Sequence, residues 1–311
     1  RTMAARAKRE IKMKAQTFSL DFDPGSERLA AGLITGAVHI FGCAADGRVR
    51  RSARFKPHAR ACRSVRHDED GGAVYTCGSD GRLCRLDVAS EACEVFDGDA
   101  KAGKCALNVV RLLPRSVVAT GDDDGAVRLW DARTRAPVST LKEQEDLVTD
   151  MCLCAKTGVE LFVTSADGTF ASYDLRKPAL KALSDNMEDE LLSACVIRGG
   201  DKILCGTQGG VLGVFSHGNY GDISDRYPGH PGSIDALLAM DARTVLTACS
   251  DGYVRTVGVH PWRLLSVAAS HGGVPVECIA LDQNRGLLAT CAHDAVIRLW
   301  DMGDAEPLAE E

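Results

Sequence analysis

The chain has 311 residues, 45% of them hydrophobic and 26% charged, which is typical of a globular protein that buries a sizeable core. Its net charge of -6 argues against a body that binds nucleic acid through broad positive charge. Thirteen cysteines without a C-x-x-C pair favour free thiols in a reducing compartment, cytosol or nucleus, over a secreted disulfide framework. No apolar stretch reaches the roughly 18 residues of a membrane span.

The N-terminal segment differs from the rest of the chain in its charge. Residues 1–14 hold six Lys or Arg residues against one Glu, a net charge of +5. We predict a basic extension over residues 1–10, and any RNA contact, expected to be weak, would come from this segment alone.

The remainder of the chain is a unit repeated seven times. The segment "GDDDGAVRLWD" at 121–131 has counterparts such as "GSDGRLCRLD" at 78–87 and "AHDAVIRLWD" at 292–301. The turn residues of the seven copies are Gly36, Gly81, Gly125, Gly168, Gly210, Gly252 and Ala295. Their spacing of 42 to 45 residues matches a four-stranded propeller blade.

The local pattern in each copy predicts a β-hairpin. An apolar run precedes the turn and a second one follows it, as in "RSVVAT" and "AVRLW" around Gly125. Asp-Gly between two such runs favours a tight turn, because glycine accepts the positive φ that the turn requires. The sequence therefore predicts an all-β fold, a single seven-bladed propeller over residues 11–302.

The copies resemble the WD-repeat (WD40) superfamily through the dipeptides Trp130-Asp131 and Trp300-Asp301. In that family a histidine, a Ser or Thr, the turn aspartate and the tryptophan of one blade form a buried hydrogen-bonded tetrad. The resemblance implies such a tetrad in the last blade. Its members would be His271, Thr290, Asp294 and Trp300. In the sixth blade Val257 replaces the tryptophan, and we expect each remaining blade to lack two or more members.

Closure of the ring calls for a strand from the other end of the chain. After Trp300 only eleven residues remain, and those at 303–311 form an acidic tail that we expect to be disordered. We predict that residues 11–14 supply the outer strand of the last blade and so cover two sheet edges.

The order of the repeats also resembles a narrower family, WD-repeat protein 55. The segments that carry this resemblance are "HARACRSVRHDEDG", "VVATGDDDGAVRLWDAR" and "GNYGDISDRYPGHPGSIDALL". Members of that family are nucleolar and act in ribosomal RNA processing. The resemblance therefore implies a nuclear or nucleolar location, with presence in the cytoplasm also possible, and a scaffold in ribosome biogenesis.

Neither a metal site nor an active site emerges from the motifs. Asp122, Asp123 and Asp124 lack the alternating ligands and distal Glu of an EF-hand. We expect Asp124 to bond nearby backbone in the turn and the other two to be solvated. The chain has no G-x-S-x-G, no H-E-x-x-H and no phosphate loop, so we expect no cofactor and no enzymatic activity.

Recognition is the remaining class of function. The tight turns and the segments entering each blade share one end of a propeller, where loops on a rigid scaffold collect binding residues. We predict there an acidic mouth for basic segments of ribosomal proteins or assembly factors. Its residues would be Asp80, Asp123, Asp167, Asp251, His293 and Asp294, with His58 and Arg60 among the few basic groups. Alternatively, these acidic turns serve solubility alone.

A second recognition hypothesis comes from two W/Y-D-x-R sequences in successive blades. Asp131 with Arg133, and Asp174 with Arg176, resemble the double box by which substrate receptors dock on the adaptor of a cullin-type ubiquitin ligase. The alternative is that each arginine pairs with its own aspartate. In either case we expect a monomer that binds proteins and no membrane.

Overall fold

Each repeat forms a four-stranded antiparallel sheet in the computed structural model of the chain. The structure describes residue 7 and residues 9–44, 48–96, 105–282, 284 and 286–304. Most of the predicted basic extension and residues 305–311 of the predicted acidic tail lie outside these residues. The described residues contain no α-helix, and therefore no helix long and apolar enough to cross a membrane.

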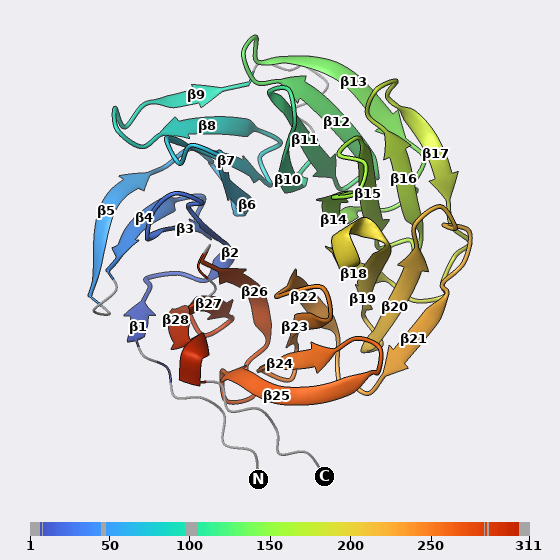
Figure 1. The fold of residues 1–311 in the computed structure, drawn as a ribbon. Helices are drawn as coiled ribbons and strands as arrows, with labels where there is room; N and C mark the ends of the chain where they lie inside the picture. The colour runs from blue at the N-terminus through green and yellow to red at the C-terminus, as the bar shows by residue number, and fades with distance from the viewer. Residues whose placement is uncertain are drawn as a thin grey trace.

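The seven sheets follow one another around a central axis (Figure 1). The first three blades comprise β2 (Thr17–Phe22), β3 (Arg28–Leu33), β4 (Val38–Cys43) and β5 (Val49–Phe55); β6 (Cys62–His67), β7 (Ala73–Gly78), β8 (Leu83–Asp87) and β9 (Cys93–Val95); and β10 (Leu107–Leu113), β11 (Val117–Asp122), β12 (Ala126–Asp131) and β13 (Ala136–Lys142). In each blade the first strand lies nearest the axis and the fourth lies on the rim.

The next three blades repeat this order, and the last blade differs only in its outer strand. They comprise β14 (Val148–Leu153), β15 (Glu160–Ser165), β16 (Phe170–Asp174) and β17 (Ala179–Leu183); β18 (Leu191–Ile197), β19 (Lys202–Thr207), β20 (Val211–Ser216) and β21 (Asp225–Pro228); β22 (Ile234–Ala239), β23 (Thr244–Cys249), β24 (Tyr253–Gly258) and β25 (Arg263–Ser270); and β26 (Val276–Leu281), β27 (Leu287–Ala292), β28 (Val296–Asp301) and β1 (Arg9–Lys12). The predicted seven-bladed propeller is confirmed.

The N-terminal strand closes the ring, as predicted, but two residues earlier than the range 11–14. Strand β1 pairs antiparallel with β28, with Ile11 opposite Ile297. The earlier start lets Glu10 pair with Arg298 at 3.0 Å. Ile11 and Met13 then pack against the hydrophobic cluster between the last blade and the first, so burial fixes the register.

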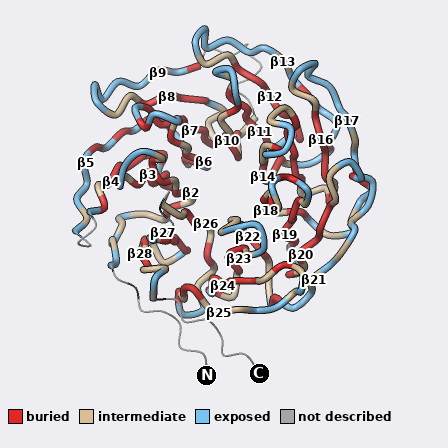
Figure 2. Tube along the Cα trace, in the orientation of Figure 1, coloured by how far each residue is buried: buried red, intermediate tan, exposed pale blue. Residues whose placement is uncertain are grey.

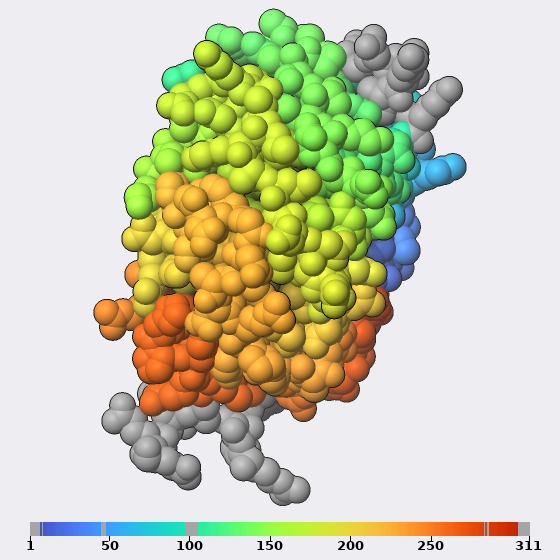
Figure 3. Space-filling view, turned by 90° about the vertical axis from the view of Figure 1, so that its right-hand side faces the viewer, coloured from blue at the N-terminus to red at the C-terminus, as the bar shows by residue number. Residues whose placement is uncertain are grey.

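The hydrophobic core lies between blades. A cluster of buried side chains occupies each junction of neighbouring blades, and Phe96 of blade 2, for example, meets Trp130 of blade 3 edge to face at 6.1 Å. Figure 2 shows the middle strands of the blades as mainly buried and outer strands such as β13 and β17 as mainly exposed. In the side view of Figure 3 the blades from β10 to β25 form a continuous wall. Blade-to-blade packing therefore makes the ring a rigid frame for its loops.

The tight turns define one end of the ring, which we call the turn face. The turn residue has a positive φ in every blade, from 54° at Ala295 to 87° at Gly252. A Cβ at Gly36 would lie 2.0 Å from the carbonyl oxygen of Arg60. The loop that enters the next blade can therefore pack on this turn only because no side chain is present. The other end, with the hairpins between the first and second strands, is the opposite face.

Candidate protein-interaction surfaces

The last blade brings together the four side chains that the sequence proposes as a tetrad. His271 Nε2 lies 2.7 Å from Thr290 Oγ1, and Trp300 Nε1 donates to the same hydroxyl at 2.8 Å. His271 Nδ1 lies 3.3 Å from Asp294 Oδ2. His271, Thr290 and Trp300 are buried, so these bonds satisfy polar groups that water does not reach.

Arg298 connects this group of side chains to the closing strand. The sequence analysis missed this role of Arg298. Its guanidinium lies 2.5 Å from Asp294 and 3.0 Å from Glu10, and it also contacts His271. One cation therefore links β1, β28 and the tetrad. The signal in the sequence is an arginine four residues after the turn aspartate, a spacing that blade 6 shares through Arg255.

Blade 2 corrects two sequence-based expectations. His58 Nδ1 lies 2.9 Å from Asp80, and its Nε2 lies 3.0 Å from Thr76. The blade thus retains three tetrad members, with Leu86 in place of the tryptophan, so the expectation that it lacks two or more is wrong. His58 is 1% exposed and cannot serve as a basic group of the mouth. The imidazole ring of His58 is buried between Thr76 and Asp80, and this burial keeps it from reaching a partner at the surface.

The acidic cluster of blade 3 is arranged differently from the prediction. Asp122, not Asp124, bonds the turn: its Oδ1 accepts from the backbone N–H groups of Asp124 and Ala126 at 3.1 and 2.8 Å. Asp122 is buried and pairs with Arg128 at 3.1 Å, and its burial raises the pKa of this carboxyl above the ordinary value. Asp123 and Asp124 are exposed. Asp122 ends strand β11 facing inward, which makes it the bonding residue.

Most of the remaining carboxylates of the proposed mouth have partners of their own. Asp251 contacts Arg255 at 2.5 Å, and Asp294 is held as described above. Asp80 also accepts from backbone N–H groups, and Asp167 accepts from Thr169 and from the backbone of Glu145. His293 is half exposed and pairs with Glu277 at 2.7 Å. Of the five turn aspartates proposed for the mouth, only Asp123 belongs to the exposed class.

Exposed carboxylates nevertheless gather on the turn face, over blades 3 to 5. We call this set the acidic arc. It consists of Asp123, Asp124, Glu145, Asp146, Glu188 and Glu190. Four of the six come from loops between blades, a position that the sequence analysis did not consider for carboxylates.

Contacts between turns and loops hold the acidic arc together. The backbone N–H of Glu145 donates to Asp167 in the turn of blade 4 at 2.8 Å, and Asn186 donates to the backbone oxygen of Asp167 at 2.5 Å. The backbone N–H of Gln208, in the turn of blade 5, donates to the oxygen of Glu190 at 3.0 Å. The turns of blades 4 and 5 and the two loops thus form one fixed surface.

Basic side chains occupy the same face over blades 1 and 2. Lys56, Arg60, Arg63 and Arg82 are all exposed. The turn face therefore carries two regions of opposite charge rather than one acidic mouth.

Comparison with known proteins identifies the family of this propeller. The WDR55 family model matches residues 8–305. The chain is 35% identical to WD repeat-containing protein 55 of Arabidopsis thaliana, over 94% of the chain and 82% of that protein. It is 38% identical to WD repeat-containing protein JIP5 of Coprinopsis cinerea (94% and 74% covered) and 30% identical to WD repeat-containing protein 55 of Homo sapiens (94% and 76%).

The chain belongs to the WDR55 family. Its seven WD-repeat blades form a scaffold of the kind that generally mediates protein–protein interactions, and the fold is typical of non-enzymatic proteins.

On the opposite face of this WDR55-family propeller lie the two W/Y-D-x-R sequences. Arg133 contacts both carboxylate oxygens of Asp131, at 3.3 and 3.0 Å, and Arg176 contacts Asp174 in the same way. These hydrogen bonds lower the pKa of each aspartate to about 2. The local pairing offered as the alternative is present, yet the two arginine side chains remain 75% and 66% exposed.

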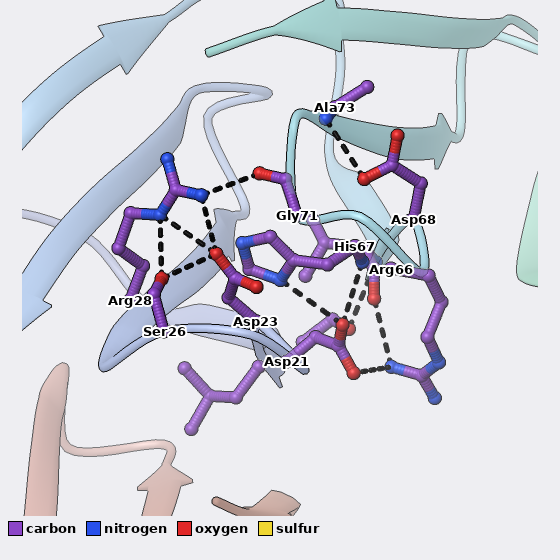
Figure 4. Close-up of polar contacts among 12 residues, drawn as sticks. Asp21, Asp23, Ser26, Arg28, Arg66, His67, Asp68, Gly71 and Ala73 are labelled. Atoms are coloured by element: carbon purple, nitrogen blue, oxygen red, sulfur yellow. Dashed lines mark hydrogen bonds and ion pairs between the residues drawn. The ribbon is translucent and has the colours of Figure 1, made fainter. Parts of the chain in front are cut away.

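Where the first strands of the blades end, at the opposite face, the central channel contains a hollow of about 510 Å³. Arg66 and Arg111 line it together with Asp21, and Asp150 pairs with Arg111 at 2.8 Å. Asp21 lies 3.7 Å from Arg66 and accepts from the backbone of His67 at 2.7 Å (Figure 4). Opposite charges therefore balance in this channel, and its polar contacts join blade 1 to blade 2.

An ion pair with a buried carboxylate strengthens the same junction, also in Figure 4. Asp23 lies 2.6 Å from Arg28, whose guanidinium donates to the backbone oxygen of Gly71 in blade 2 at 2.7 Å. A Cβ at Gly71 would lie 2.2 Å from Asp23 Oδ1. This set of contacts therefore serves the joint between blades rather than a ligand.

Proposed function

We propose that this chain is a non-enzymatic scaffold in ribosome biogenesis, acting in pre-ribosomal RNA processing in the nucleolus. Membership of the WDR55 family and the resemblance described above support the pathway. The observation that carries the binding mode is the acidic arc, a fixed set of exposed carboxylates on loops of a rigid ring. Such a surface attracts basic segments of ribosomal proteins or assembly factors and repels RNA phosphate.

The arc binds by many weak contacts rather than one strong contact. An exposed ion pair contributes about 0–1 kcal/mol, so no single carboxylate dominates. Several acting on one flexible basic segment raise the association rate and add to a useful affinity. Binding of this kind weakens with salt, because the Debye length falls from about 10 Å at 0.1 M to about 3 Å at 1 M.

A double charge reversal tests the arc. We expect Asp123→Lys with Glu188→Lys to weaken binding of Lys/Arg-rich peptides about tenfold at low salt and little at high salt. The matched control is Glu69→Lys with Asp70→Lys, two exposed residues of the β6–β7 hairpin on the opposite face, which changes the net charge equally. Fluorescence anisotropy at several salt concentrations measures both. Equal weakening by the two variants would contradict recognition at the arc.

Depletion in cells tests the pathway separately. We expect loss of the protein to accumulate unprocessed pre-ribosomal RNA on hybridisation blots, and the tagged protein to co-purify with pre-ribosomal factors. Unchanged precursor levels would contradict a role in processing even if the arc binds basic peptides.

A second candidate function is substrate reception for a cullin-type ubiquitin ligase. The observation that favours it is the exposure of Arg133 and Arg176, each held in a fixed orientation by its own aspartate. Arg176 borders a hollow of about 100 Å³ with apolar walls that include Leu113 and Leu175. Exposed guanidinium groups beside apolar surface suit bidentate docking to a partner's carboxylates.

Changing both arginines to alanine separates docking from local pairing. We expect Arg133→Ala with Arg176→Ala to abolish co-purification of the ligase adaptor and to leave the melting temperature unchanged, because exposed pairs stabilise little. Adaptor binding that survives the change, or that the intact protein never shows, would exclude this candidate.

A further inference from the structure

Three side chains that lie far apart in the sequence converge where blade 4 meets blade 5. Cys154 directly follows β14, Glu160 begins β15, and His217 follows β20. One potential ligand atom of each lies within 4.8 Å of the other two. Cys154 and Glu160 are buried, whereas the side chain of His217 is 19% exposed, so the cluster opens to solvent on one side.

Backbone hydrogen bonds hold Cys154, Glu160 and His217 in place without a ligand. The N–H of Cys154 donates to the backbone oxygen of Glu160 at 2.8 Å. The N–H of His217 donates to the oxygen of Asp201 at 2.9 Å. The cluster is therefore set by the strands and turns that carry it, and little chain entropy remains to be lost on binding.

The carboxylate of Glu160 is the centre of the cluster. Its Oε2 lies 3.1 Å from His217 Nε2 and accepts from the Tyr220 hydroxyl at 3.0 Å, and its Oε1 contacts Lys181. A hydrogen-bonded network would account for these four residues. It does not involve the thiol of Cys154, which forms no hydrogen bond in the described part of the chain.

We propose that Cys154 Sγ, Glu160 Oε2 and His217 Nε2 bind a Zn²⁺ ion. Thiolate, imidazole and carboxylate are the ligand types that zinc takes in proteins, and a harder cation such as Mg²⁺ or Ca²⁺ would not accept the sulfur. The sequence analysis expected no metal because it tested the aspartates of blade 3 and local motifs, and these three residues share no local motif.

The distances suit this ion. Zinc bonds to nitrogen and oxygen are about 2.0–2.2 Å, so the 3.1 Å between His217 Nε2 and Glu160 Oε2 corresponds to an angle of about 97° at the metal. The Sγ atom of Cys154 lies within 4.8 Å of the other two ligand atoms, so a Zn–S bond of about 2.3 Å requires it to approach them by about 1 Å at most. The fourth position faces the exposed side of His217 and is left to a water molecule.

Binding moves a hydrogen at two groups, Cys154 and His217. The S–H bond of Cys154 breaks, a Zn–S bond forms, and the proton leaves to water. His217, whose Nε2–H faces the Glu160 carboxylate in the free protein, binds as neutral imidazole with its hydrogen on Nδ1, and Lys181 remains on the other carboxylate oxygen of Glu160. The ion joins ligands from blades 4 and 5. His217 directly precedes the segment "GNYGDISDR", and Tyr220 lies within it.

Cobalt spectroscopy of the full chain tests the site. After removal of metal by a chelator, we expect Co²⁺ to give a thiolate-to-metal charge-transfer band at one equivalent, and Zn²⁺ to abolish it. Cys154→Ser should remove the band. The matched control is Cys205→Ser, a buried thiol of the same hydrophobic cluster, which should retain it. A missing band in the intact protein, or a band that survives Cys154→Ser, overturns the proposal.

A second variant distinguishes a metal site from a hydrogen-bonded network. Because the positive charge of Lys181 beside Glu160 repels the ion, Lys181→Ala should tighten Zn²⁺ binding about tenfold in calorimetry. Zn²⁺ should also raise the melting temperature of the intact protein and not that of His217→Gln. The proposal is overturned if Lys181→Ala leaves the affinity for Zn²⁺ unchanged or weakens it. It is also overturned if Zn²⁺ raises the melting temperatures of the intact protein and of His217→Gln equally, because the metal then binds elsewhere.

Discussion

Three buried threonines in blades 3, 6 and 7 differ in how many polar groups depend on their hydroxyl. Thr120 accepts from Trp130 Nε1 at 2.9 Å, and Thr247 lies 2.9 Å from His230 Nε2. Thr290 serves a tryptophan and a histidine at once, at 2.8 and 2.7 Å. All three threonines are 0% exposed, so water cannot replace a lost bond.

Replacement by valine keeps the shape of the side chain and removes the hydroxyl. A buried polar group left without a partner costs about 1–3 kcal/mol. Thr120→Val and Thr247→Val should therefore each lower the free energy of unfolding by about 1–3 kcal/mol. Thr290→Val leaves two polar groups without a partner, so it should lower the free energy of unfolding by about the sum of both costs, roughly 2–6 kcal/mol. Thr140→Val, on the exposed strand β13, is the control and should change stability by less than about 0.5 kcal/mol.

Urea unfolding followed by tryptophan fluorescence measures the four variants against the intact protein, with the free energy taken from midpoint and slope. The decisive comparison is the order of the losses. If Thr290→Val loses no more than Thr120→Val or Thr247→Val, the hydroxyl of Thr290 does not hold both partners, and the additive reasoning is refuted.

Two further predictions concern ring closure and pH. Deletion of residues 1–12 should lower the melting temperature and cause aggregation measurable by light scattering, because it exposes the edge of β28 and removes the Glu10–Arg298 pair; a monodisperse truncation of unchanged stability would contradict closure by β1. Burial lowers the pKa of His39 and of His230 from 6.5 to about 4, so between these values the unfolded chain binds protons that the folded chain does not. Stability should therefore fall as the pH falls from 6.5 to 4, and His230→Gln should reduce that slope in urea titrations; an unchanged slope would show that His230 does not contribute.

The repeats themselves were predictable because each of their signals is local. A positive-φ turn between two apolar runs needs only the residues of one hairpin, and this pattern recurs seven times at nearly constant spacing. The tetrad positions follow from the same repeat, as His271 and Trp300 show. Blade 2 carries the same local signal, because Thr76 stands four residues before Asp80 as Thr290 does before Asp294, and the sequence analysis overlooked it.

The charge of the turn face could not be deduced from the turn aspartates alone. Asp251 and Asp123 look alike in the sequence, yet Arg255 neutralises the first, whereas the second belongs to the acidic arc. Arg128 lies four residues after Asp124 but pairs with Asp122, because the strand carries Asp122 into the interior. Pairing depends on which way a strand end faces, and alternation along a twisted strand only partly fixes that direction.

The sequence by itself determined the number of blades, the positions of the turns and the need for an N-terminal closing strand. Only the tertiary structure decided which side chains of different blades meet, as Cys154 and His217 do across 63 positions of the chain. The physical reason is that turns and strands arise from neighbours in the chain, whereas the seams between blades arise from packing around the closed ring, which brings together residues whose separation in sequence carries no local signal.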